Sequence, residues 1–136
     1  MHGKRSMIVV DTSIWIDFFN KRNTIHTETL KELFSMDVLG TGDIILTEVL
    51  QGFKTDRGFR LAKQRLSSLS VFNMLGYENA IRSAENYRFL RKRGITIRAT
   101  ADVIIASFCI ANGHSLLFSD SDFEPFVEHL GLVAVR

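Results

Sequence analysis

Cysteine, proline and long apolar runs are scarce in the 136-residue sequence, and each scarcity excludes a class of protein. The single cysteine, Cys109, cannot form an internal disulfide, which argues against a disulfide-stapled secreted scaffold and favours a buried thiol in a reducing cytoplasm. The single proline, Pro125, and the lack of repeats or low-complexity stretches leave no candidate linker. No apolar run approaches the roughly 20 residues of a membrane-spanning helix. We therefore expect one compact cytoplasmic unit without a membrane partner.

Apolar residues are plentiful enough for one core, at 46% of the sequence against 24% charged residues. A chain of this length is expected to bury a single core and is too short for two. The basic start "MHGKRS" precedes strand-forming residues, not a long apolar segment with a cleavage site. We therefore expect residues 1–6 to form a short flexible lead and residues 7–136 to form a single domain.

Strand-like apolar runs alternate with the apolar spacing of amphipathic helices. The pattern predicts strands at 7–10, 70–74, 116–118 and 132–135. It predicts helices at 12–19, 24–38, 44–53, 57–69, 78–93 and from Thr100, as N-cap, to Ala111, with Gly40 and Gly42 interpreted as helix breakers. Strands that are apolar on both faces and alternate with helices indicate an α/β fold. We expect a central parallel sheet of four to five strands with helices on both faces.

Several acidic residues lie next to the predicted core, where a charged side chain needs a partner. In "IVVDTSIWIDFF" Asp11 ends the first strand, and in "LLFSDSDF" Asp120 ends a late one. Binding sites of parallel sheets form beyond the carboxyl ends of the strands, where both acids fall. Glu48 lies in an apolar helix, Asp102 opens a buried helix and Asp122 follows Asp120 by two residues. Taken singly, each acid has an ordinary explanation as a cap, a turn residue or an exposed position.

Taken together, the acids indicate a metal site. Two carboxylates about 4 Å apart repel by roughly 4 kcal/mol at an effective dielectric constant of 20, so a cluster persists only with protonation or a bound cation. An all-oxygen ligand set favours Mg²⁺ or Mn²⁺ over zinc. The four histidines show no ligand-like spacing. A divalent ion on carboxylates activates water and neutralises a phosphodiester, and the sequence leaves one or two ions open.

The chain resembles PIN domains, and more narrowly the VapC-type toxins of bacterial and archaeal toxin–antitoxin systems. The resemblance rests on four motifs in the family's order: "VVDTSIWIDFF", "LTEVLQGF", "TADVIIASFCIANG" and "LLFSDSDF". It implies a small fold with a central parallel sheet, Mg²⁺- or Mn²⁺-dependent endoribonuclease activity and inhibition by a cognate VapB-like antitoxin. It also implies a homodimer, and it leaves transfer RNA and ribosomal RNA open as substrates.

The resemblance also implies the roles of particular residues. The acidic set around the metal would be Asp11, Glu48, Asp102 and Asp120, and Asp122 would be an additional acid that binds through water. Thr12 and Ser13 would support this set by hydrogen bonding. The mechanism expected is in-line attack on RNA by a metal-activated water, without a covalent enzyme intermediate.

Positive charge is concentrated in the middle of the chain. Residues 51–100 hold eleven Lys and Arg residues against three acids, a net charge of +8, whereas the remainder carries −6. Such a stretch suits a polyanionic substrate, and we expect RNA phosphates to contact Arg88, Arg91 and Arg98. Tyr87 and Phe89 lie among these cations and would either stack on unpaired bases or pack in the core.

Competing functions fit the sequence less well. A receiver domain needs paired acids near the first strand and a late lysine, and a haloacid-dehalogenase-type phosphatase needs an aspartate where Ser13 stands. A non-catalytic PIN-like module would be expected to lack one or more of the four acids. A DNA-directed nuclease of the same fold stays open, because carboxylate–metal chemistry does not by itself discriminate the sugar.

Overall fold

The fold is built around a parallel sheet. The computed structural model describes residues 5–136 and contains five strands: β1 (Ile8–Val10), β2 (Leu39–Gly42), β3 (Ser70–Phe72), β4 (Ser115–Leu117) and β5 (Val133–Ala134). They lie in the order β3-β2-β1-β4-β5, and every neighbouring pair is parallel. The predicted α/β class with a parallel sheet of four to five strands is confirmed.

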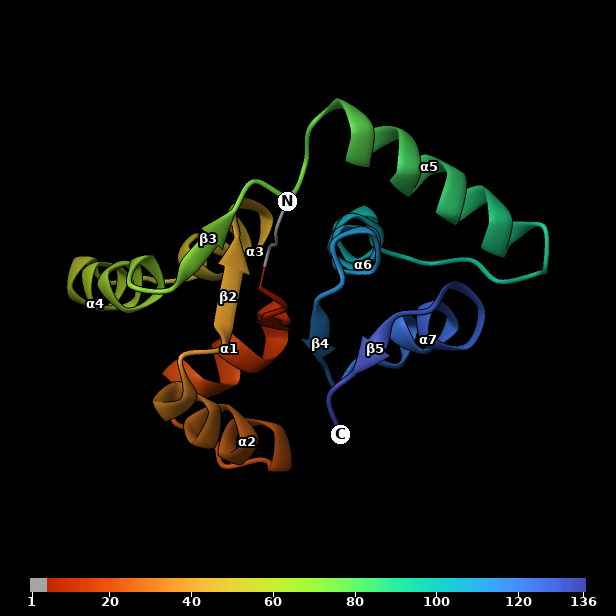
Figure 1. The fold of residues 1–136 in the computed structure, drawn as a ribbon. Helices are drawn as coiled ribbons and strands as arrows, with labels where there is room; N and C mark the ends of the chain where they lie inside the picture. The colour runs from red at the N-terminus through yellow and green to blue at the C-terminus, as the bar shows by residue number, and fades with distance from the viewer. Residues whose placement is uncertain (1–4) are drawn as a thin grey trace.

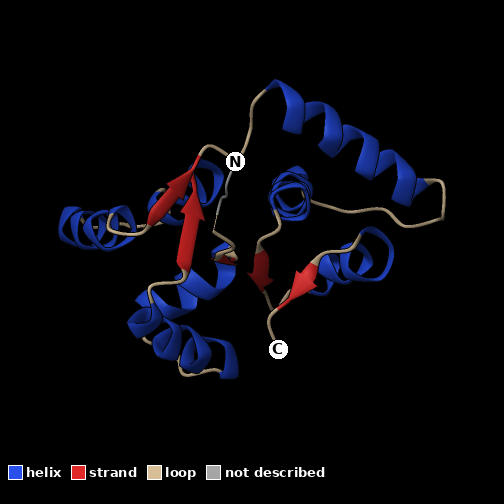
Figure 2. Ribbon diagram, in the orientation of Figure 1, coloured by secondary structure: helices blue, strands red, loops and turns tan. Residues whose placement is uncertain are grey.

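Seven α-helices cover the sheet. They are α1 (Thr12–Phe19), α2 (Ile25–Leu33), α3 (Asp43–Leu50), α4 (Asp56–Ser67), α5 (Tyr77–Arg91), α6 (Thr100–Asn112) and α7 (Glu124–Leu130), with short 3₁₀ turns η1 (Phe34–Met36) and η2 (Ser121–Phe123). In Figure 1 helices α1–α4 gather on the left and α5–α7 on the right, and Figure 2 shows the strands between them. The chain moves from β1 outward to β3 and then crosses to β4 and β5. Right-handed crossovers in these opposite directions place the two helix groups on opposite faces.

Strand β2 was not predicted, because Gly40 and Gly42 were interpreted only as helix breakers. The structure gives both glycines a packing reason. A Cβ at Gly40 would lie 2.6 Å from Phe72 Cε2, and a Cβ at Gly42 would overlap the side chain of Met74. The glycines therefore let the side chains of the β3 segment cross directly over the β2 backbone.

Several further boundaries differ from the prediction, among them the two that follow. Thr100 is the first residue of α6 and Ala99 is its N-cap, so the predicted cap is wrong by one position. The helix predicted from 24 to 38 ends at Leu33 and continues as a 3₁₀ turn. Helix α7 was not predicted. It has Pro125 in its first turn, where the missing N–H has no intrahelical acceptor to lose.

Helix α6 is central to the core, since every residue from Val103 to Cys109 is buried. Burial raises the pKa of the Cys109 thiol to about 12, which keeps it protonated and unreactive. Within residues 5–136 no helix is both long and apolar enough to span a bilayer. Arg5 and Ser6 donate hydrogen bonds to the backbone oxygens of Asp37 and Gly113. Residues 1–4 of the predicted lead lie outside the described residues, so its flexibility stays a prediction.

Candidate metal centre

The order in which the chain adds strands to the sheet reverses between β1 and β4. These two strands are neighbours at the centre of the sheet, although the chain forms β2 and β3 between them. Asp11 follows the last residue of β1, and its N–H donates to Leu117 O, at the end of β4, across 2.9 Å. Asp120 lies three residues beyond Leu117. Both acids are therefore at the topological switch point, where open α/β sheets form their binding sites.

Three carboxylates meet beside this switch point. Asp102, Asp120 and Asp122 each offer an oxygen, and these three oxygens all lie within 4.8 Å of one another. Asp102 comes from the first turn of α6, whereas the other two flank the start of η2. Asp120 is the N-cap of η2, and its Oδ1 accepts the N–H of Asp122 across 2.9 Å. The "SDSDF" sequence thus folds back on itself so that two acids separated by one residue face the same point.

Asp11 and Glu48 lie next to this three-carboxylate group without belonging to it. Asp11 is only 5% exposed, and Ser13 Oγ donates to its Oδ2 across 3.1 Å. Glu48 comes from α3, and its Oε1 accepts the Thr12 hydroxyl across 2.7 Å. The hydroxyls of Thr12 and Ser13 therefore each hold a different carboxylate, which fixes the orientation of two acids from separate elements.

Burial and neighbouring negative charges make the Asp11 and Asp102 side chains harder to ionise. Burial raises the pKa of Asp11 to about 6, with a further contribution from Glu48, although hydrogen bonds from Thr12 and Ser13 oppose the rise. Burial also raises the pKa of Asp102 to about 7, and the charges of Asp11, Asp120 and Glu48 add to this effect. Ionised carboxylates in this environment need a cation. The oxygen-only donor set fits a hard divalent ion such as Mg²⁺ or Mn²⁺.

Arg98 brings one positive charge to the cluster. Its Nε lies 3.0 Å from Asp122 Oδ2, while 77% of its side chain is exposed. The hydrogen bond and charge of Asp122, followed by the charges of Asp120 and Asp102, raise the pKa of the Arg98 guanidinium. Arg98 was predicted only as an RNA contact, and its pairing with a site acid was not predicted because the two residues are 24 positions apart.

Some other basic residues of the middle segment lie against aromatic rings. The Arg91 guanidinium lies 5.5 Å from the centre of the Tyr87 ring, and that of Arg93 lies 3.5 Å from the centre of the Phe89 ring. Phe89 is half-buried against the core, while Arg88 is exposed. RNA contact by Arg88 and Arg91 stays a prediction.

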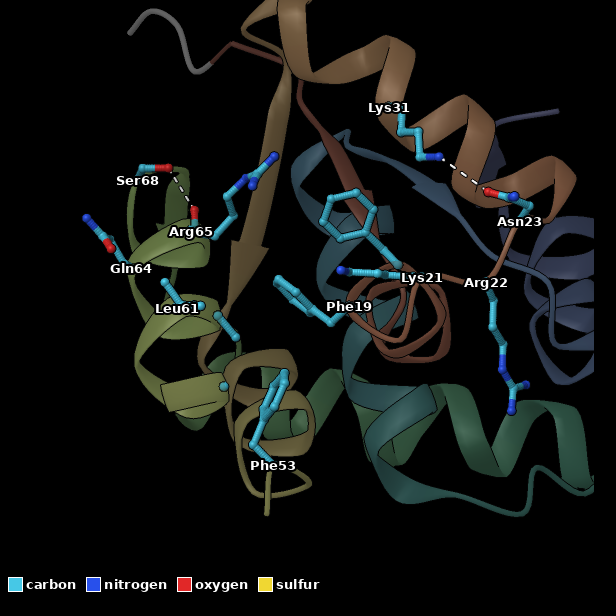
Figure 3. A pocket seen from close by; sticks show the side chains of 13 residues that line it. Phe19, Lys21, Arg22, Asn23, Lys31, Phe53, Leu61, Gln64, Arg65 and Ser68 are labelled. Atoms are coloured by element: carbon cyan, nitrogen blue, oxygen red, sulfur yellow. Dashed lines mark hydrogen bonds between the residues drawn. The ribbon is translucent and has the colours of Figure 1, made fainter. Parts of the chain in front are cut away.

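A second surface feature is an apolar groove between α1, α2 and α4, with a volume of about 980 Å³ (Figure 3). Its apolar lining includes Phe18, Phe19, Phe53 and Leu61, and its basic residues are Lys21, Arg22, Lys31 and Arg65. The groove was not predicted, since the sequence does not separate exposed apolar helix faces from ordinary core. The signal available in the sequence was the proximity of Lys21 and Arg22 to Phe18 and Phe19.

The fold and the switch-point carboxylates define a PIN domain, and the chain belongs to the PIN domain family: the family model matches residues 8–126. The chain is 27% identical over 130 residues to VapC ribonuclease Mb1587 of Mycobacterium bovis and to Ribonuclease VapC11 of Mycobacterium tuberculosis. In both comparisons the match covers 94% of this chain and 97% of the relative. The crystal structure of VapBC2 from Rickettsia felis bound to a promoter DNA fragment contains a similar fold, with a TM-score of 0.75 at 20% identity over 95% of this chain and 97% of that one.

Proposed function

We propose that this protein is a metal-dependent endoribonuclease that hydrolyses RNA phosphodiester bonds and serves as the toxin of a VapBC-type toxin–antitoxin pair. The observation that carries the proposal is the meeting of Asp102, Asp120 and Asp122 at the switch point, with Asp11 and Glu48 beside them. Membership of the PIN family and the likeness to VapC ribonucleases over nearly the whole chain support it.

In this proposal Asp102, Asp120 and Asp122 hold Mg²⁺ or Mn²⁺, and Asp11 and Glu48 complete the acidic set. A bound divalent ion supplies an activated water and neutralises negative charge on the phosphodiester. Ser13 keeps the Asp11 carboxylate oriented, and Thr12 does the same for Glu48. Fixed partners of this kind commonly contribute 10–100-fold, roughly, to metal affinity or activity.

The substrate is held by positive charge. The strongly basic segment 51–100 would bind phosphates of single-stranded or looped RNA, with Arg88, Arg91 and Arg98 as contacts. Because Arg98 lies at the rim of the carboxylate group, it is placed to hold a phosphate next to the one that is cleaved.

The proposal is tested by incubating the purified protein with total cellular RNA in EDTA, Mg²⁺ or Mn²⁺ and mapping the new ends. We expect discrete cuts with either metal and none in EDTA. Asp102→Asn should abolish the cuts, whereas Asp56→Asn, an exposed acid in the first turn of α4, should leave them unchanged. Cutting by Asp102→Asn at the wild-type rate would refute the proposed site.

We propose that the partner is a VapB-like antitoxin and that an amphipathic acidic segment of it occupies the groove of Figure 3. Aromatic and aliphatic side chains line the groove and four basic residues border it, so an acidic helix with one apolar face is complementary in both respects. The fold shared with chains of VapBC complexes supports a partner of this class.

Co-expression tests this partner, with the product of the gene immediately upstream if that gene encodes a small DNA-binding protein. Leu61→Glu places a charge on a 56%-exposed groove residue and should prevent co-purification without lowering the melting temperature. Met36→Glu, at a 59%-exposed position outside the groove, is the matched control. Equal capture by both variants would exclude the groove. The homodimer implied by the family resemblance also stays a prediction, which sedimentation velocity would test.

A further inference from the structure

We propose that the hollow between α5 and α6 is a nucleotide subsite that holds a base of the RNA beside the cleaved phosphodiester; this rests on the proposed nuclease function. The hollow has a volume of about 480 Å³, within the roughly 300–1,000 Å³ typical of small-molecule pockets. Helices α5 and α6 pack along each other, and the segment that joins them carries Arg98. The hollow therefore borders the candidate metal centre at Arg98.

Arg98 connects the two sites. It lines the hollow while its Nε donates to Asp122. Its two Nη groups donate to no residue in the part of the chain that the structure describes, so the outer edge of the guanidinium is free for a phosphate oxygen. Arg88, from the last turn of α5, also lines the hollow. Two cations on one lining and an acidic metal site next to it suit a nucleotide whose phosphate points toward the metal.

Ser83 gives an independent indication of a ligand. It lines the hollow and is only 6% exposed, and its Oγ has no hydrogen-bond partner among residues 5–136. A buried hydroxyl without a partner is unfavourable, and native proteins keep few of them unless a ligand or water completes the bond. A hydroxyl both donates and accepts, which suits the edge of a nucleobase.

The remaining lining suits the body of a base. Leu75, Val103 and Ile104 provide apolar surface, and Tyr87 adds an aromatic ring. Sequence-selective recognition of RNA commonly inserts an unstacked base between such groups and reads its edge by hydrogen bonds. A second copy of this chain would be the competing occupant, because Leu75 is 44% exposed at the hollow, but a protein surface gives no reason for the two arginines beside the acids.

Two variants separate the subsite from a structural role. Ala84→Leu fills the hollow from an exposed α5 position, and Ser83→Ala removes only the unpartnered hydroxyl. Ala111→Leu, at an exposed position of α6 outside the hollow, is the control. Each ¹⁵N-labelled protein is titrated in EDTA with AMP, GMP, CMP and UMP, and amide shifts are followed by NMR. Cleavage of a random RNA pool with Mn²⁺ then gives the base preference around the cut.

We expect at least one nucleotide to shift amides of α5 and α6 in the wild type and the Ala111→Leu control. Ala84→Leu should weaken this binding by at least about tenfold through overpacking, and Ser83→Ala by about fivefold, since one hydrogen bond is lost. Ser83→Ala should not lower the melting temperature, which a purely structural hydroxyl would do. Ala84→Leu should also lose the base preference at one position beside the cut while it retains metal-dependent cleavage.

Three results would overturn the subsite: no nucleotide shifts these amides, the variants bind and select bases as the wild type does, or Ala84→Leu changes only the oligomeric state. The last result would assign the hollow to a second copy. These outcomes differ from failure of the proposed nuclease function, in which the wild type itself cuts no RNA with Mg²⁺ or Mn²⁺.

Discussion

Arg98 donates from Nε to Asp122 Oδ2 across 3.0 Å, so one cation of the basic middle segment bonds directly to the acidic cluster. This pair joins the two charge patterns of the chain. The guanidinium competes with a divalent ion for the same carboxylate, and it repels that ion as well. Its Nη groups, which donate to no residue among 5–136, favour a phosphate at the same time. Arg98 is therefore expected to weaken metal binding and strengthen substrate binding.

Arg98→Gln should consequently bind Mn²⁺ more tightly and RNA more weakly. We expect a severalfold lower Kd for Mn²⁺ and a KM for RNA raised by about tenfold, since a charge-assisted contact contributes about 1.5–3 kcal/mol. Isothermal titration and steady-state cleavage of a short RNA give the two constants. Arg60→Gln, an exposed position on α4, makes the same change of charge away from the cluster and should alter neither constant by more than about twofold. Equal changes in both variants would show that Arg98→Gln acts through the net charge of the protein and not through the contact with Asp122.

Without metal, stability should fall as the pH rises from about 4 to about 7. The pKa values of Asp11 and Asp102 are raised from 3.8 to about 6 and about 7, so the folded chain holds more protons than the unfolded chain in this window. The free energy of unfolding then decreases with pH, on the order of 2–3 kcal/mol from Asp11 alone. Chemical denaturation in EDTA at a series of pH values measures it.

The double variant Asp11→Asn, Asp102→Asn provides the reference for this measurement. It should lack this component of the pH dependence and be more stable than the wild type at pH 8 in EDTA. Millimolar Mg²⁺ should restore stability to the wild type alone. If the two proteins lose stability in parallel over this pH range, ionisation of Asp11 and Asp102 is not the cause of the loss.

Thr12→Val should impair the site without harming the fold. The Thr12 hydroxyl donates to Glu48 Oε1 across 2.7 Å, and valine keeps the shape while it removes the donor. We expect Mn²⁺ affinity or kcat to fall by roughly 10–100-fold, as for other partners that orient metal-site acids, with little change in melting temperature. Thr47→Val removes the hydroxyl adjacent to Glu48 in sequence, which bonds instead to Asp43 O. Equal losses in both variants would show that Glu48 does not depend on Thr12.

The class of fold was predictable because the strands are apolar and the apolar residues of the helices recur at helical spacing. Helix α1 was predicted at the residues where it occurs, Thr12–Phe19. Strand β2 was missed because the reason for Gly40 is a long-range contact with Phe72, which no local pattern contains. Glycine in a sequence predicts the end of a helix, whereas here Gly40 lies within a strand because the Phe72 side chain leaves no room for a Cβ.

The sequence singled out the candidate acids but not their arrangement, and their roles stay predictions. Asp11 and Asp120 could be placed together because parallel strands end on one edge of the sheet. That Asp102 shares the closest group with Asp120 and Asp122, while Glu48 instead accepts from Thr12, depends on how α3 and α6 are oriented. The groove and the hollow were missed because each depends on how helices pack against one another, which the sequence pattern does not contain.

The central claim is that these carboxylates hold a divalent cation, and titration of metal-free protein with Mn²⁺ by calorimetry at pH 7.5 tests it most directly. We predict saturable binding to the wild type and a loss of affinity beyond about 100-fold in Asp120→Asn, since a ligand contributes more than the 10–100-fold of an orienting partner. Unsaturable heats in the wild type, or equal affinity in the variant, would contradict the account.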